Sequence, residues 1–178
     1  LTLEKYCYGF KNSFCWWVEE GTKEVAHMFQ RGLNRNYGIW FNNKENQYFS
    51  KEGVRVVKID ENTAKGKLET IKRAIISVIN LVKNNKFSEI KEEKELWHQA
   101  KAKIIYLYFP DKTLPILSKE HLRHICEDIS LNHYKEDNHF ESSHELLKLL
   151  KSIEPFNNWN SLKISYFIYK EYNSIFKR

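Results

Sequence analysis

The spacing of apolar residues changes near residue 60, and this change constrains the fold more than any other feature. Before it, aromatic and β-branched runs are separated by short polar stretches with glycine and asparagine, which is typical of strands joined by turns. After it, apolar residues recur at helical spacing: Leu68, Ile71, Ile75, Val78, Ile79 and Val82. We therefore predict a single α+β domain over 1–178, with a small β-rich part at 1–60 and a helical part at 67–178.

The β-rich part contains four candidate strands. Residues 14–18 are aromatic and β-branched, which favours a half-buried strand. The runs 38–41 and 47–50 flank a polar, asparagine-rich stretch, which predicts a hairpin. Residues 54–59 predict a further strand.

The helical part is expected to hold about five helices. The first covers about 67–85, and a charge-rich connector over 88–95 follows it. Residues 97–108 fit either a buried helix or a buried strand. We favour a helix that ends before Pro110, because the residue before a proline is disfavoured in the α region. The remaining three are predicted from an N-cap at Ser118, a capping box at Ser142–Glu145 and an apolar pattern over 161–176.

Composition excludes several classes of protein. Hydrophobic residues make up 42% of the 178 residues, so the chain can build a core. It has no apolar run of the ~18 residues that a membrane helix needs. With three cysteines and no secretory signal at the N-terminus, we expect a protein of the reducing cytoplasm. The chain does not begin with Met, so we expect a fragment or a processed form.

The common catalytic and cofactor-binding motifs are absent. The sequence contains no Gly-x4-Gly-Lys-Ser/Thr phosphate loop, no Gly-x-Gly-x-x-Gly fingerprint and no Gly-x-Ser-x-Gly elbow. We therefore expect no enzyme activity and no cofactor in this chain.

Two weaker patterns have simpler explanations. His121 and His124 lie on one predicted helix with Cys126 nearby, but no complete set of zinc ligands follows, so we predict no metal site. Asp60 with Glu89 and Lys91 has the residue types of a metal-dependent nuclease. A chance match in a chain rich in lysine and glutamate is the preferred interpretation.

Positive charge gathers near the amino end. The chain carries 29 basic and 23 acidic residues, a net charge of +6, which favours a polyanionic partner. Seven cations and three glutamates lie between residues 22 and 58, together with several aromatic residues. Basic groups hold phosphates, and aromatic rings stack on unpaired bases.

This segment supplies the predicted nucleic-acid-binding residues. If Ile39 and Phe41 point into the core, strand alternation leaves Trp40 exposed for stacking. We predict phosphate contacts from Lys23, Arg31, Arg35 and Lys44, and base contacts from Asn34 or Asn36.

Several blocks of the chain resemble the N-terminal regions of McrB-like AAA+ GTPases, subunits of modification-dependent restriction systems. The longest block is residues 104–125, with Leu-Tyr-Phe-Pro-Asp-Lys, a Leu-Pro-Ile step and a helix containing His-Leu-Arg. Residues 17–25 and 37–44 are similar to the family's Thr-Lys-Glu step and its Gly-Ile-aromatic-Phe hairpin. Residues 28–36 depart from the family, because they hold one glycine where the relatives have a glycine-rich loop.

The resemblance implies a target-recognition module for phage defence. It would bind double-stranded DNA. In such systems a modified base is often flipped into a pocket of this module. The AAA+ motor would lie further along a longer chain or in a partner, and it would couple recognition to a nuclease subunit. Two alternatives remain open: a protein-interaction module whose helical half docks onto a restriction or AAA+ partner, and an RNA-binding domain.

Overall fold

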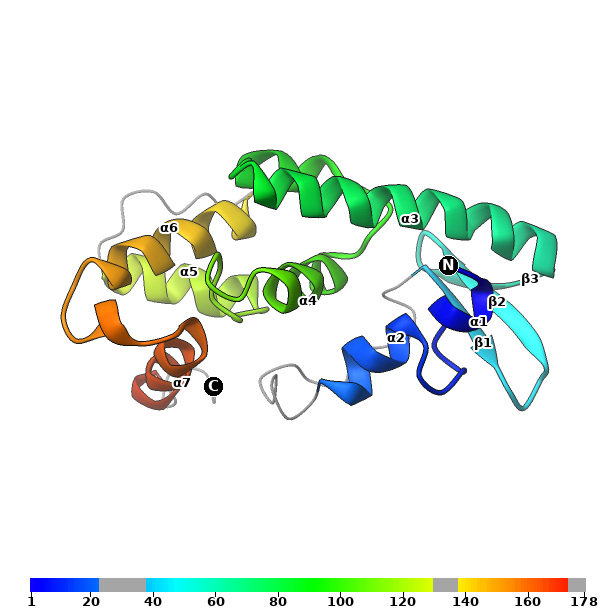
Figure 1. Cartoon of the computed structure of the whole chain (residues 1–178), viewed down its shortest axis with the longest axis horizontal. Coiled ribbons are helices and arrows are strands. Elements are labelled where there is room, and N and C mark those ends of the chain that lie inside the picture. Colours follow the sequence, from blue (N-terminus) through cyan, green and yellow to red (C-terminus); the bar gives the residue numbers. More distant parts are fainter. Residues whose placement is uncertain (23–37, 130–137, 173–178) are drawn as a thin grey trace. The chain divides into compact units, whose positions relative to one another are not determined.

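The computed structural model describes residues 1–22, 38–129 and 138–172. It confirms the α+β class, with a three-stranded sheet followed by helices (Figure 1). The chain divides into two compact units: unit 1 is 1–78 with 93–104, and unit 2 is 79–92 with 105–178. The division therefore falls after residues 78, 92 and 104, and not between a β-rich and a helical part. The single domain stays a prediction.

The sheet of unit 1 is an antiparallel meander. Strands β1 (Ile39–Asn42), β2 (Gln47–Glu52) and β3 (Arg55–Ile59) pair in the order β1-β2-β3, which confirms the hairpin and the following strand. The Asn42 side chain accepts a hydrogen bond from the Lys44 backbone N–H at 3.0 Å and closes the turn, as asparagine does in such loops.

Residues 14–21 are helical, so the strand predicted over 14–18 is wrong. The first 22 residues contain α1 (Leu3–Tyr6), α2 (Phe14–Trp16) and a π-helical turn, η1 (Trp17–Gly21). The Ser13 hydroxyl accepts from the Trp16 backbone N–H at 3.2 Å and begins α2. Aromatic strand propensity mainly reflects packing, and here a local cap and tertiary contacts override it.

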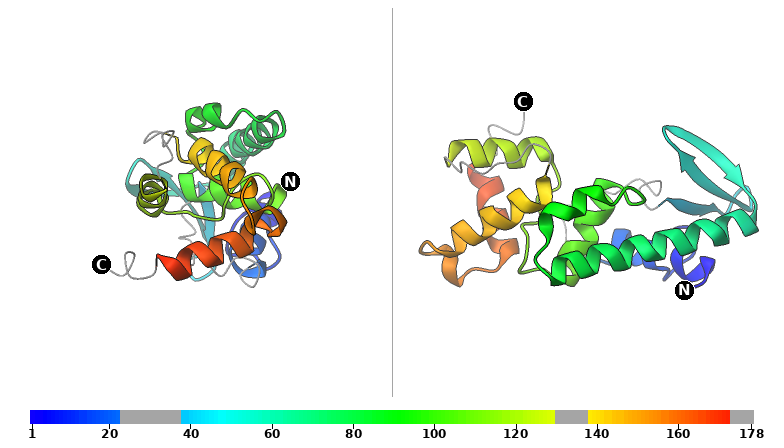
Figure 2. Two further views of the ribbon diagram at one scale, coloured as in Figure 1. Left: turned by 90° about the vertical axis from the view of Figure 1, so that its left-hand side faces the viewer. Right: turned by 90° about the horizontal axis from the view of Figure 1, so that it is seen from above.

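Helix α3 (Glu61–Lys83) begins six residues earlier than the apolar pattern predicted. The carboxylate of Asp60 accepts from the Thr63 backbone N–H at 2.8 Å, so this residue caps the helix. Two views show the sheet lying along the N-terminal part of α3 (Figure 2).

A 3₁₀ helix, η3 (Phe87–Glu92), and then α4 (His98–Tyr108) follow. Helix α4 confirms the prediction for 97–108. In the connector predicted over 88–95 only Ile90 is buried, and its charged residues are exposed except for the half-buried Glu93.

The helices of unit 2 pack around their own apolar core. They are α5 (Lys119–Asp128), α6 (His139–Lys151), a 3₁₀ turn η4 (Phe156–Asn158) and α7 (Ser161–Glu171). The core is built from the residues Leu114, Ile116, Leu122, Ile125, Cys126, Leu146, Leu147, Ile164 and Ile168. The cap at Ser118 is confirmed, since its hydroxyl accepts from the His121 backbone N–H at 3.2 Å.

The predicted start of α6 is wrong. The helix begins at His139, and its N-cap is Asn138, whose side chain accepts from the Glu141 backbone N–H at 3.3 Å. The serines of the expected capping box are buried inside the helix, where the Ser143 hydroxyl donates to the carbonyl of Leu114 at 3.2 Å. No helix within the described ranges is both long and apolar enough to cross a bilayer.

Candidate nucleic-acid interface

Most of the predicted contact residues lie outside the described residues. This holds for Lys23, Arg31, Asn34, Arg35 and Asn36. Lys44 is described, and it is exposed in the turn between β1 and β2.

The expectation that Trp40 is exposed is wrong. Its exposed fraction is 9%, and its ring stacks on Phe49 of the neighbouring strand at a centroid distance of 5.9 Å. Strand alternation does place Trp40 and Ile39 on opposite faces, yet both are buried. Strand β1 is thus covered on both faces, whereas the prediction required one face to be open. The exposed indoles of the described part of unit 1 are instead Trp17, at 50%, and Trp97, at 44%.

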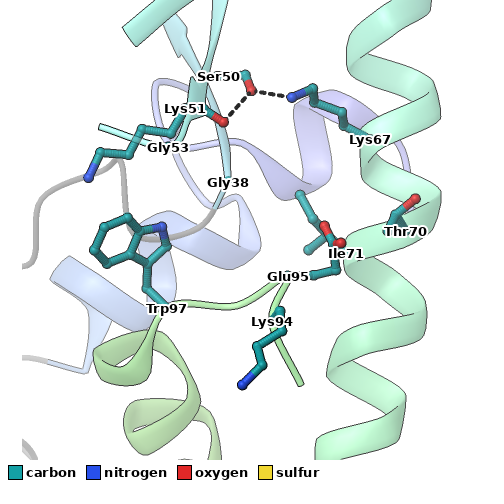
Figure 3. A pocket seen from close by; sticks show the side chains of 10 residues that line it. All are labelled: Gly38, Ser50, Lys51, Gly53, Lys67, Thr70, Ile71, Lys94, Glu95 and Trp97. Carbon is teal, nitrogen blue, oxygen red and sulfur yellow. Dashed lines mark hydrogen bonds between the residues drawn. The ribbon is translucent and has the colours of Figure 1, made fainter. Parts of the chain in front are cut away.

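Trp97 borders a pocket of about 480 Å³ in unit 1. Four segments line it: Gly38 just before β1, the end of β2 with the turn after it, the middle of α3, and residues 94–97, which lead into α4. Figure 3 shows Lys67 reaching from α3 toward Ser50 on β2, with the indole of Trp97 below Lys51. The volume lies within the range of small-ligand sites, ~300–1,000 Å³.

Strand β2 and helix α3 are joined at the pocket by a polar contact. The Lys67 ammonium donates to the Ser50 hydroxyl at 2.7 Å. At the same wall Gly38 has a φ of +84°, and a Cβ there would lie 2.8 Å from Cδ1 of Ile71. Glycine therefore allows the start of β1 to approach α3 closely.

Trp97 and Lys51 meet at the opposite wall. The Lys51 ammonium lies 3.7 Å from the centre of the Trp97 ring, which is a cation–π contact. The segment that carries the indole is anchored in two ways. Leu96 is buried at 3% exposure, and the Lys101 ammonium donates to the carbonyl of Glu93 at 2.8 Å. The indole is thus exposed on an anchored segment.

The lining carries an excess of positive charge, with Lys51, Lys67 and Lys94 against Glu95. Ammonium groups beside an exposed indole can hold a phosphate and an aromatic base together. Sequence reasoning included Lys51 in the basic segment but missed Lys67, Lys94 and Trp97. These residues come from separate segments that only the fold brings together, and no local motif marks them.

A metal site and a metal-dependent nuclease would both need a cluster of metal ligands. Among the residues that the structure describes, no three His, Cys, Asp or Glu side chains gather to hold a metal ion. His121 contacts the Tyr169 hydroxyl at 3.3 Å, and burial lowers the pKa of its imidazole. Asp60, considered above for a nuclease, caps α3.

Comparison with known proteins gives no relative: no family model, no curated protein and no solved structure matches the chain.

Proposed function

We propose that this chain is a DNA-binding, target-recognition module of the kind used by McrB-like restriction systems. The observation that carries the proposal is the Lys51–Trp97 pair beside Lys67, in a pocket large enough for a nucleotide. In this proposal both lysines contact backbone phosphates, and Trp97 stacks on a flipped or modified base.

The geometry sets how such binding would proceed. The Lys51 ammonium covers part of the Trp97 ring in the structure. A base that stacks on this face must displace the ammonium. The displaced ammonium can then bind a neighbouring phosphate. Lys67 likewise leaves the Ser50 hydroxyl and binds a phosphate. Phosphate binding and base stacking are therefore coupled through the movement of Lys51.

The proposal assigns no catalytic step to this chain. A motor and a nuclease, in the same longer chain or in partner subunits of the cytoplasm, supply nucleotide hydrolysis and cleavage. In this proposal the other basic residues of 22–58 supply further phosphate contacts.

The test is a series of DNA-binding measurements on the full chain at increasing salt, with a fluorescein-labelled duplex that contains one unpaired base. Lys51→Ala and Lys67→Ala should each lower the slope of log affinity against log salt by about 0.9. Trp97→Ala should weaken binding by about 1–3 kcal/mol, the value of one base stack.

Matched controls lie elsewhere on unit 1. Lys11→Ala removes an exposed lysine and Trp17→Ala an exposed indole, neither of which lines the pocket. Both should bind like the unmodified chain. Affinity that does not depend on salt, or pocket variants that behave like the controls, would refute the proposal. Competition with single-stranded RNA of the same sequence distinguishes the RNA-binding alternative, because RNA would then displace the DNA.

A further inference from the structure

The outward face of α7 carries two aromatic residues between two lysines. Residues spaced by three, four and seven positions share one face of a helix. Four residues at this spacing are exposed on α7 and are called the α7 stripe: Lys163, Tyr166, Phe167 and Lys170. The opposite face, with Ile164 and Ile168, is buried in the core of unit 2. Tyr166 is 70% exposed, an unusual exposure for a large ring.

The stripe continues onto an aromatic cluster beside it. The ring of Phe167 packs against Phe156 at 5.3 Å and against Trp159 at 5.7 Å, measured between ring centres. The Lys163 ammonium lies 4.1 Å from the centre of the Trp159 ring. Ile153, just before this cluster, is also exposed. Phe167 is exposed where it contacts the partly buried rings of Phe156 and Trp159, and exposed apolar surface rimmed by polar residues marks an interaction site.

We propose that the α7 stripe docks an acidic segment of a partner protein that presents apolar side chains between its carboxylates. The stripe itself contains no acidic residue, and its two lysines are seven positions apart, about 10 Å along the helix axis. Carboxylates at both ends of an apolar segment match this pattern of charge. Glu171, four positions after Phe167, is exposed at the end of α7 and repels an acidic segment that is displaced toward it.

A second copy of this chain fits the stripe poorly. Antiparallel pairing of two stripes sets Lys163 against Lys170, and parallel pairing sets each lysine against itself. Like charges then meet at both ends of the apolar contact, which destabilises it. The net charge of +6 on each chain adds to the repulsion.

The test selects random 16-residue peptides, displayed on phage, on the full 178-residue chain. Selected peptides should be rich in Asp and Glu around apolar residues. Synthetic copies should bind at least ~10-fold more weakly to Tyr166→Ala, a loss of ~1.4 kcal/mol. The matched control is Tyr108→Ala, which removes an exposed tyrosine on α4 and should leave peptide affinity unchanged.

Charge reversal tests the choice of partner directly. The pair Lys163→Glu and Lys170→Glu should abolish binding of the acidic peptides, whereas Lys83→Glu with Lys86→Glu, on exposed residues before η3, should reduce it less than threefold. Circular dichroism verifies that each variant is folded. The proposal is overturned if selection returns no peptide that depends on Tyr166, or only neutral or basic ones. It is equally overturned if the stripe serves another occupant. Tyr166→Ala would then abolish binding of single-stranded DNA, tested with oligo(dT), or self-association of the chain.

Discussion

Glu19 and Lys103 form an ion pair inside unit 1, and removing one partner is the sharpest stability test that the fold offers. The Lys103 ammonium donates to the Glu19 carboxylate at 2.7 Å, and each side chain is only 3% exposed. Water therefore does not compensate the charge that remains after a single substitution. We expect Lys103→Met to destabilise the chain by about 3–5 kcal/mol, the cost of leaving a buried charge without its partner.

The double substitution separates pairing from packing. Replacing both residues, with Glu19→Leu and Lys103→Met, removes both charges and keeps apolar volume. Because a buried pair gains little over apolar residues, the double variant should lie within about 1 kcal/mol of the unmodified chain or be more stable. The coupling energy is calculated from the unmodified chain, the single variants Glu19→Leu and Lys103→Met, and the double variant. It should exceed the effect of an ordinary exposed pair, about 0–1 kcal/mol.

Urea unfolding followed by tryptophan fluorescence measures these changes. Four of the five tryptophans lie in unit 1, so the signal reports mainly on the unit that contains the pair. With a slope of about 2 kcal/mol per molar urea, a loss of 4 kcal/mol lowers the midpoint by about 2 M. Lys11→Met, at an exposed lysine, should change the stability by less than about 0.5 kcal/mol. The reasoning is refuted if Lys103→Met behaves like this control, or if the two single losses simply add in the double variant.

Three further predictions concern the pocket wall, the cap of α3 and the thiols. Gly38→Ala should destabilise the chain by about 1 kcal/mol or more in urea, because it forces a side chain to a φ of +84° against Ile71; an unchanged midpoint would contradict this. Hydrogen bonds from Thr63 lower the pKa of Asp60, so its stabilisation of α3 is complete above the ordinary pKa of about 4 and is lost as pH falls. In Asp60→Ala the contribution of Asp60 to the acid-induced loss of helical circular-dichroism signal at 222 nm should disappear. An acid titration identical to that of the unmodified chain would be evidence against the cap. Burial raises the pKa of all three cysteine thiols, so iodoacetamide at pH 8 should label them only after unfolding in urea; labelling of the folded chain would show that they are accessible.

Local sequence signals predicted those parts of the fold that depend on neighbouring residues. The asparagine-rich turn, the N-cap at Ser118 and the end of α4 before Pro110 each depend on a few adjacent residues. Residues 14–18 were predicted wrongly because aromatic residues favour strands only through packing, and at this point Ser13 caps a helix.

The site was harder to predict because it is assembled from distant segments. Lys51, Lys67 and Trp97 are separated by 16 and 30 positions, and no periodic pattern connects them. Trp40 was chosen from strand alternation alone, which indicates opposite faces but not whether each face is covered. Its burial against Phe49 depends on tertiary packing.

The most direct test of DNA binding at the pocket follows the five tryptophan indole N–H signals by NMR, with ¹⁵N-labelled full chain. Trp97→Phe identifies the signal of Trp97, and Trp40→Phe that of the buried indole. During titration with the duplex that contains one unpaired base, the Trp97 signal should shift and saturate with the dissociation constant measured by fluorescence, while the Trp40 signal moves little. Saturable DNA binding that leaves the Trp97 signal in place would contradict the account.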